Sequence, residues 1–189
     1  YQSKDLSVLM NSLESLSDDW RRWASAHCRV VGPVARRWHC SPTDRQHIRQ
    51  ELGVRPEGKL IVVTIGGSEG GLYLARIARH AFETIQRSIP DATLLIILGP
   101  AIEPQPAGLA PTERVFIRGY EPQLISYVAA SDLVICNAGF STLAEIALRA
   151  KVPTITSPLG CHWEQQANAR AAVAAGYAVS IDRAKLSAN

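Results

Sequence analysis

The sequence lacks any apolar run that approaches the roughly 20 residues a helix needs to cross a bilayer, and no signal peptide is visible. It also lacks a strong charge of either sign. Its 20 basic and 17 acidic residues give a net charge of +3, and the Lys and Arg side chains are scattered along the chain. Because proteins that bind nucleic-acid phosphates gather positive charge on one face, we expect no nucleic-acid partner.

A metal-binding pattern is missing as well. The repeat of His27-Cys28 and His39-Cys40 fits no common zinc spacing. With 47% hydrophobic residues in 189, the chain can build a core without disulfides. We therefore expect reduced thiols in a cytoplasmic protein, with no metal and no other cofactor. The four cysteines are Cys28, Cys40, Cys136 and Cys161.

The first quarter of the chain differs in pattern from the rest. Apolar residues from Leu6 to Trp23 recur at spacings of three and four, which predicts an amphipathic helix over residues 5–23. A short strand over 28–31 follows. Residues 35–58 are polar, and we interpret them as a linker in which Thr43 caps a helix over 44–52. This divides the chain into an N-terminal helix and linker region, 1–53, and a main domain, 54–189.

From Lys59 onward, strand and helix patterns alternate. Apolar, β-branched runs such as Leu60–Ile65 are typical of strands that are covered on both faces. The pattern predicts an α/β fold, a Rossmann-like parallel sheet of about six strands with helices on both faces. Ligands of such folds bind at the carboxyl ends of the strands. The predicted strands are 60–65, 93–98, 115–117, 132–136, 153–156 and 178–181.

The loop after the first of these strands, Gly66–Gly71, is rich in glycine, which lets the backbone approach a ligand closely. It is not the dinucleotide fingerprint, because its third residue is Ser68 rather than glycine. It is not a Walker loop either, since no Gly-Lys-Ser/Thr follows. The loop is compatible with contact to a phosphate or sugar, and equally with a tight strand-to-helix turn.

Two further loops carry chemistry. In Gly119–Gln123, Tyr120 can stack on a base while the backbone of the next residue binds its edge; alternatively, Tyr120 is a plain surface or core aromatic. In Cys136–Ala147, a strand breaks at Gly139 and a helix begins, where backbone N–H groups and hydroxyls favour a phosphate. Glu145, one turn further, suits the hydroxyl pair of a ribose; its alternative is an exposed helix residue.

The segment His162–Asn168 begins another helix with acidic and amide side chains, which suit sugar hydroxyls. Glu164 is equally explained as a first-turn carboxylate that the helix dipole favours. Gln165 is equally explained as ordinary helix surface. His162 lies near the expected sugar, but no partner for it is evident, and we find no convincing catalytic base in the chain.

Taken in order, these loops resemble the C-terminal, donor-binding domain of GT-B glycosyltransferases. The nearest resemblance is to glycosyltransferase family 28, which includes the peptidoglycan lipid-intermediate N-acetylglucosaminyltransferase. The resemblance spans about residues 30–182. The motifs of family 28 stand here as Gly66-Gly67-Ser68-Glu69-Gly70, Ser131-Asp132 and Gly139-Phe140-Ser141-Thr142-Leu143-Ala144-Glu145. Two further segments resemble the signature of plant-type secondary-product glucosyltransferases, Tyr120-Glu121-Pro122-Gln123 and Glu164-Gln165-Gln166-Ala167-Asn168-Ala169.

The resemblance implies a role for each of these residues. Tyr120 would stack on the base, the Glu121 backbone would bind its edge, and Gln123 would belong to the same nucleotide site. Glu145 would accept the ribose hydroxyls. Gly139, Phe140, Ser141 and Thr142 would hold the diphosphate, and Gly67 and Ser68 would line the diphosphate or acceptor side. Glu164 and Gln165 would bind the donor sugar. Asn137 stands where the related plant glucosyltransferases have a histidine, so that a cationic contact is missing there.

The function implied is that of the donor-binding half of an inverting glycosyltransferase, which moves a sugar from a nucleotide diphosphate, UDP in the first instance, to an acceptor hydroxyl. The acceptor domain and the base would lie outside this chain, and the Tyr1 start favours a fragment. A lipid-linked acceptor would place the full enzyme at the inner face of a membrane. The alternatives are a donor-binding subunit of a split glycosyltransferase, a UDP-sugar epimerase or hydrolase, and, last, an NAD-binding domain.

Overall fold

The computed structural model describes residues 17–27, 35, 40–66, 69–104 and 108–186. The chain forms two compact units, Tyr1–Arg37 and Trp38–Asn189. The first contains helix α1 (Asp18–His27), in which the rings of Trp20 and Trp23 meet edge to face at 5.7 Å. The described part of the predicted helix 5–23 is therefore helical and continues to His27, whereas its start and the predicted strand 28–31 lie outside the described residues.

The second unit contains a six-stranded, wholly parallel sheet in the order β3-β2-β1-β4-β5-β6. All six strands lie within one or two residues of their predicted bounds, and the predicted Rossmann-like fold is confirmed. β1 is the first strand in the sequence but lies in the middle of the sheet, between β2 and β4. The chain adds β2 and β3 on one side of β1, then returns and adds β4, β5 and β6 on the other side. The strands are β1 (Lys59–Thr64), β2 (Ala92–Ile97), β3 (Val115–Arg118), β4 (Leu133–Cys136), β5 (Thr154–Thr156) and β6 (Ala178–Ser180).

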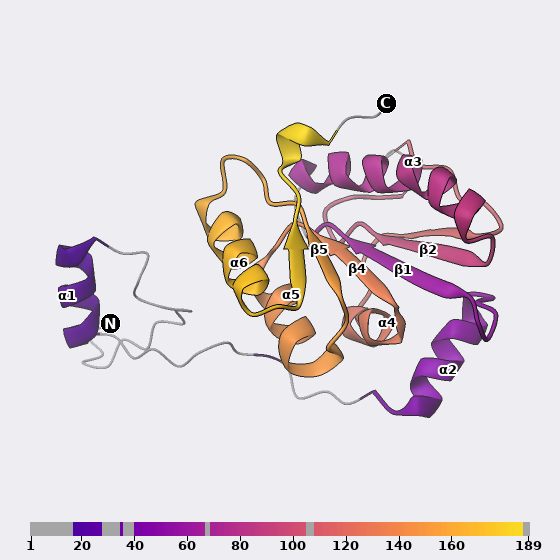
Figure 1. Ribbon diagram of the computed structural model, residues 1–189, viewed down its shortest axis with the longest axis horizontal. Coiled ribbons are helices and arrows are strands. Elements are labelled where there is room, and N and C mark those ends of the chain that lie inside the picture. Colours follow the sequence, from indigo (N-terminus) through magenta and orange to yellow (C-terminus); the bar gives the residue numbers. More distant parts are fainter. Residues whose placement is uncertain (1–16, 28–34, 36–39, 67–68, 105–107, 187–189) are drawn as a thin grey trace. The chain divides into compact units, whose positions relative to one another are not determined.

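Helices cover both faces of this sheet, but unequally (Figure 1). On one face of the sheet, side chains of α2, α4, α5 and α6 form one apolar core with β1, β2 and β4. On the other face, α3 packs in a second apolar core. No helix in the described ranges is long and apolar enough to cross a bilayer. The helices of this unit are α2 (Pro42–Glu51), α3 (Leu72–Ser88), α4 (Leu124–Ala130), α5 (Phe140–Glu145, extended by a π-helical turn, Ile146–Ala150) and α6 (Trp163–Ala174).

Helix α2 belongs to the sheet unit rather than to a linker. Its cap is Ser41 rather than the predicted Thr43: the Ser41 hydroxyl accepts the N–H of Asp44, and the Asp44 carboxylate accepts the N–H of Ser41. Ile48 is buried in the core beside Leu52. The compact unit thus begins before α2, whereas we predicted a division after residue 53, because a helix with few apolar residues shows little periodicity in the sequence.

Arginines on α2 fasten the helix to the start of β4. Arg49 and Arg45 donate to the two carboxylate oxygens of Asp132, at 2.9 Å and 3.3 Å, and the N–H of Leu60 donates to it at 2.8 Å. Burial by itself would raise the pKa of Asp132, but these hydrogen bonds and the nearby guanidinium charges outweigh it and hold the pKa below its usual value. The acidic residue of the motif Ser131-Asp132 is therefore a structural hub.

Candidate functional site

The sequence motif that begins at Cys136 forms a tight link between β4 and α5. Ala138 has a φ of 62°, in the left-handed region, and is fully buried. Such a backbone costs a residue with a Cβ about 1–2 kcal/mol. The fold holds it there because Asn168 of α6, itself buried, donates from Nδ2 to the Ala138 carbonyl at 3.1 Å. The loop after β4 is therefore positioned by the helix that follows β5.

Asn137 connects the same loop to β1. Its Nδ2 donates to the carbonyl of Ile65 at 2.9 Å, and its side chain is almost wholly buried. The loops after β1 and β4 thus touch at the point where the strand order reverses, which is the usual ligand-binding crevice of an open α/β sheet. Sequence reasoning noted Asn137 only as a missing histidine; its position beside Ile65 requires the sheet order.

The glycine-rich loop packs directly against this contact. A Cβ on Gly71 would lie 2.6 Å from both the Cβ and the carbonyl oxygen of Ile65, and 2.7 Å from Nδ2 of Asn137. Gly71 has an ordinary helical backbone, with φ −78° and ψ −20°, so its need for glycine comes from close packing and not from dihedral freedom. Gly67 and Ser68, predicted on the diphosphate or acceptor side, lie outside the described residues.

We predict that Gly71→Ala destabilises the protein by about 2 kcal/mol, because the added methyl group collides with the backbone of β1 as well as with a side chain. The matched control is Gly160→Ala, where a Cβ meets nothing within 4 Å and the backbone has no positive φ. Urea unfolding followed by circular dichroism measures both. Equal unfolding free energies for the two variants would contradict this packing account.

The residues expected to hold the diphosphate and ribose lie on α5. Gly139 is its extended N-terminal cap, Phe140 and Thr142 are half-buried, and Ser141 is exposed. Glu145 is only 8% exposed. The alternative interpretation of Glu145 as an exposed helix residue is therefore wrong.

The loop after β3 is held by its own charged side chains. The Glu121 carboxylate accepts the N–H of Gln123 at 3.0 Å and the guanidinium of Arg118 at 3.0 Å. Arg118 also pairs with Glu51 of α2 and lies over the Tyr127 ring, 4.7 Å from its centroid. Burial would lower the pKa of Arg118, but these partners raise it above its usual value.

This network leaves the aromatic residue of the loop, Tyr120, projecting with 66% of its surface exposed. A core role for Tyr120 is therefore excluded. A ring on a braced loop beside the binding edge of the sheet is free to stack on a planar group. Glu121, in contrast, has its carboxylate engaged, which leaves the backbone as the part of this residue available to a ligand.

The residues expected to bind the donor sugar begin α6. Glu164 is exposed and accepts from Nδ2 of Asn168 at 3.3 Å. Gln165 accepts the N–H of Leu159 at 2.9 Å through its side-chain oxygen, which braces the loop after β5. Gln165 is therefore more than ordinary helix surface. Asn168 thus joins α6 to the loop after β4.

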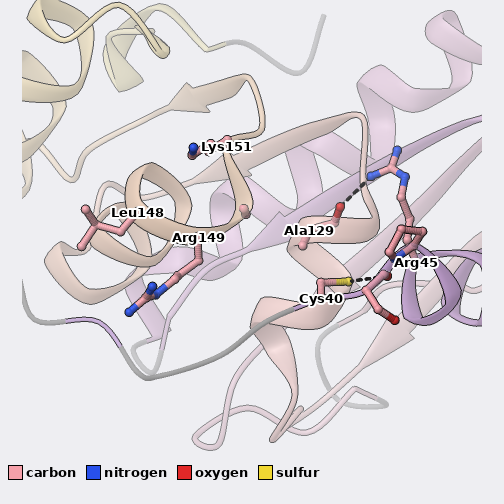
Figure 2. Close-up of a pocket in the computed structure, with 9 residues that line it drawn as sticks. Cys40, Arg45, Ala129, Leu148, Arg149 and Lys151 are labelled. Atoms are coloured by element: carbon pink, nitrogen blue, oxygen red, sulfur yellow. Dashed lines mark hydrogen bonds between the residues drawn. The ribbon is translucent and has the colours of Figure 1, made fainter.

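A pocket of about 440 Å³ lies on the opposite, amino-terminal edge of the sheet, between the start of α2, the end of α4 and the end of the π-helical turn (Figure 2). Arg45 is occupied there, because it donates to the Ala129 carbonyl at 2.6 Å, and Arg149 extends away from Cys40. None of the predicted site residues lines this pocket. In the described ranges, no group of three or more His, Cys, Asp or Glu could hold a metal ion.

A family model, the glycosyltransferase family 28 C-terminal domain, matches residues 60–189. The chain belongs to this family. A relative from Carboxydothermus hydrogenoformans is 32% identical over 161 residues, which cover 82% of this chain and 42% of that protein. It is named UDP-N-acetylglucosamine--N-acetylmuramyl-(pentapeptide) pyrophosphoryl-undecaprenol N-acetylglucosamine transferase.

Solved structures agree on the fold. MurG from Acinetobacter baumannii superimposes with a TM-score of 0.58 at 21% identity, over 85% of this chain and 44% of that one. The glycotransferase of kitacinnamycin gives a TM-score of 0.62 at 20% identity, over 98% of this chain and 43% of that one. The chain therefore spans less than half the length of these three proteins, and its sheet is one half of a GT-B fold.

Proposed function

We propose that this family 28 domain binds the nucleotide-sugar donor of an inverting glycosyltransferase, with UDP as the nucleotide and an acceptor hydroxyl as the target. The observation that carries the proposal is the position of the family motif. Asn137 ties Gly139–Glu145 to the end of β1, so that the motif stands at the crevice where the strand order reverses. The relative named above uses a UDP-sugar, which supports the choice of nucleotide.

Different loops offer groups that suit the different parts of such a donor. Tyr120 supplies an exposed ring for the base, and Glu145 a buried carboxylate for the ribose. Ser141, Thr142 and the N–H groups at the start of α5 supply hydrogen-bond donors for the diphosphate, and Glu164 an exposed carboxylate for sugar hydroxyls. These groups would stabilise the negative charge that develops on the leaving diphosphate without a metal ion.

The acceptor and the catalytic base belong, in this proposal, to a second domain or a partner subunit. The donor crevice opens at one edge of a single sheet, and this chain matches only 43% and 42% of the length of two relatives. A lipid-linked acceptor, which the name of the relative contains, would bring the complete enzyme to a membrane surface on the cytoplasmic side.

Calorimetric titration with UDP, dTDP and GDP tests the donor assignment. We expect UDP to bind most tightly, with its affinity unchanged by EDTA because no metal takes part. Preference for dTDP or GDP would overturn the choice of nucleotide, and the absence of binding by all three would overturn the proposed function. A following panel of UDP-sugars identifies the sugar; conversion or release of free sugar during the titration would favour the epimerase or hydrolase instead.

A further inference from the structure

A short 3₁₀ turn, η3 (Arg183–Lys185), follows β6 and packs against the glycine-rich loop. Arg183 donates from Nη2 to the Gly70 carbonyl at 2.6 Å, and its guanidinium lies 5.1 Å from the centre of the Tyr73 ring. The Tyr73 hydroxyl donates in turn to the Leu186 carbonyl at 2.6 Å. These contacts fix the guanidinium above the start of α3, at the binding edge of the sheet.

Among the side chains that the structure describes, Arg183 has no anionic partner. Its Nη1 is buried and has no hydrogen-bond partner, and no carboxylate within the described ranges forms an ion pair with it. Desolvation lowers the pKa of the guanidinium, and the Cys161 thiol, on the loop after β5, is close enough to interact with it electrostatically. A partly buried charge of this kind is stabilised when a ligand supplies the opposite charge.

Two more buried polar atoms without a partner directly follow the ends of β4 and β5. They are Oδ1 of Asn137 and Oγ of Ser157. Asn137 directly follows Cys136, Ser157 directly follows Thr156, and Cys136 and Thr156 are partners in adjacent parallel strands. Asn137 and Ser157 therefore lie on the same face of the sheet, with their Cα atoms about 5 Å apart. Gly70 receives Arg183, and its neighbour Gly71 packs against Asn137. The three unpartnered groups are two donors, Arg183 Nη1 and Ser157 Oγ, and one acceptor, Asn137 Oδ1. Donors suit phosphate oxygens and an acceptor suits a sugar hydroxyl, so together they complement a phosphate ester of a sugar.

We propose that Arg183 binds the diphosphate of the donor, as a positive charge that the turn after β6 delivers to the ends of β1 and β5. This inference rests on the proposed function and adds a residue that lies outside the motifs of the family resemblance. Sequence analysis missed it because Arg183 is one of twenty basic residues and is 44 residues from Gly139, which only the sheet brings near.

The test compares UDP, uridine and inorganic pyrophosphate by calorimetry at fixed ionic strength. Arg183→Gln keeps amide donors for Gly70 and removes the charge. We expect it to weaken UDP and pyrophosphate about tenfold and to leave uridine unchanged, because only the phosphates face the guanidinium. Arg183→Lys, which keeps a charge but not the planar fork, should recover part of the loss.

The matched control is Arg114→Gln. Arg114 also has a buried Nη1 without a partner, but it pairs with Asp91 at the opposite edge of the sheet, so its loss should change none of the three affinities. If Arg183→Gln weakens uridine as much as UDP and lowers the melting temperature, Arg183 only clamps the loop, and the inference is overturned. Unchanged UDP affinity overturns it as well, with the proposed function intact.

Pyrophosphate separates the two proposals. If pyrophosphate binds in a way that depends on Arg183 but UDP does not bind, the anion site at Arg183 is supported and the proposed nucleotide-donor function is overturned. Binding of neither ligand by the unmodified chain would overturn both.

Discussion

Glu145→Gln is expected to weaken UDP binding by about 1.5–3 kcal/mol, or roughly one to two decades in affinity, while uracil binds as before. A carboxylate can accept several hydrogen bonds, whereas the amide that replaces it offers one accepting oxygen and no charge. At 8% exposure Glu145 is shielded from water, so hydrogen bonds from ribose hydroxyls to it meet little competition. Calorimetry with UDP and uracil measures the difference.

Removing the hydroxyls from the ligand makes this test specific. UDP that lacks both the 2′ and the 3′ hydroxyl should bind the unmodified chain weakly. Its affinity for Glu145→Gln should be the same, and this comparison completes a double-mutant cycle between Glu145 and the hydroxyls. The matched control is Glu83→Gln, an exposed carboxylate on α3 that pairs with Arg79. If Glu145→Gln weakens the hydroxyl-free ligand as much as it weakens UDP, Glu145 supports the fold of the site and does not touch the ribose.

Asp132→Asn should lower the free energy of unfolding by about 3 kcal/mol, since it leaves the Arg49 guanidinium without its counter-charge. The Arg49 side chain is 13% exposed and the Asp132 side chain 28%, and the carboxylate also accepts the Leu60 N–H. Its loss would loosen α2 from the start of β4. Urea unfolding measures the change, and Glu83→Gln, whose more exposed carboxylate pairs with Arg79 on α3, should cost less than about 1 kcal/mol.

The same carboxylate predicts a pH dependence. Because the pKa of Asp132 is lower in the folded protein than in the unfolded chain, its contribution is fully present above the unfolded value of about 3.9. It is lost as the pH falls through the lower, folded value. Asp132→Asn should therefore remove part of the acid destabilisation seen in the unmodified chain. Parallel stability curves for the two proteins between about pH 5 and pH 2 would show that Asp132 titrates alike in both states.

Much of the fold follows from local pattern. The runs that became β1 and β2 are continuous and β-branched because both of their faces are covered, which makes such strands evident in a sequence. Glycines at 66, 71, 139 and 176 lie between these runs and the helices, so that the alternation could be counted. In contrast, α2 was assigned to a linker, because its attachment comes from two arginines whose partner, Asp132, lies more than 80 residues away.

The strand–helix alternation, the parallel sheet and the loops that carry family 28 motifs can be predicted from the sequence, since each depends on residues close together in the chain. Which side chains support those loops follows instead from the packing of the folded chain. It buried Glu145, engaged the carboxylate of Glu121, and placed Asn137 and Asn168 under the motif that begins at Cys136. It also carried Arg183 to Gly70, because the order of parallel strands, which no local pattern encodes, sets which loop ends meet.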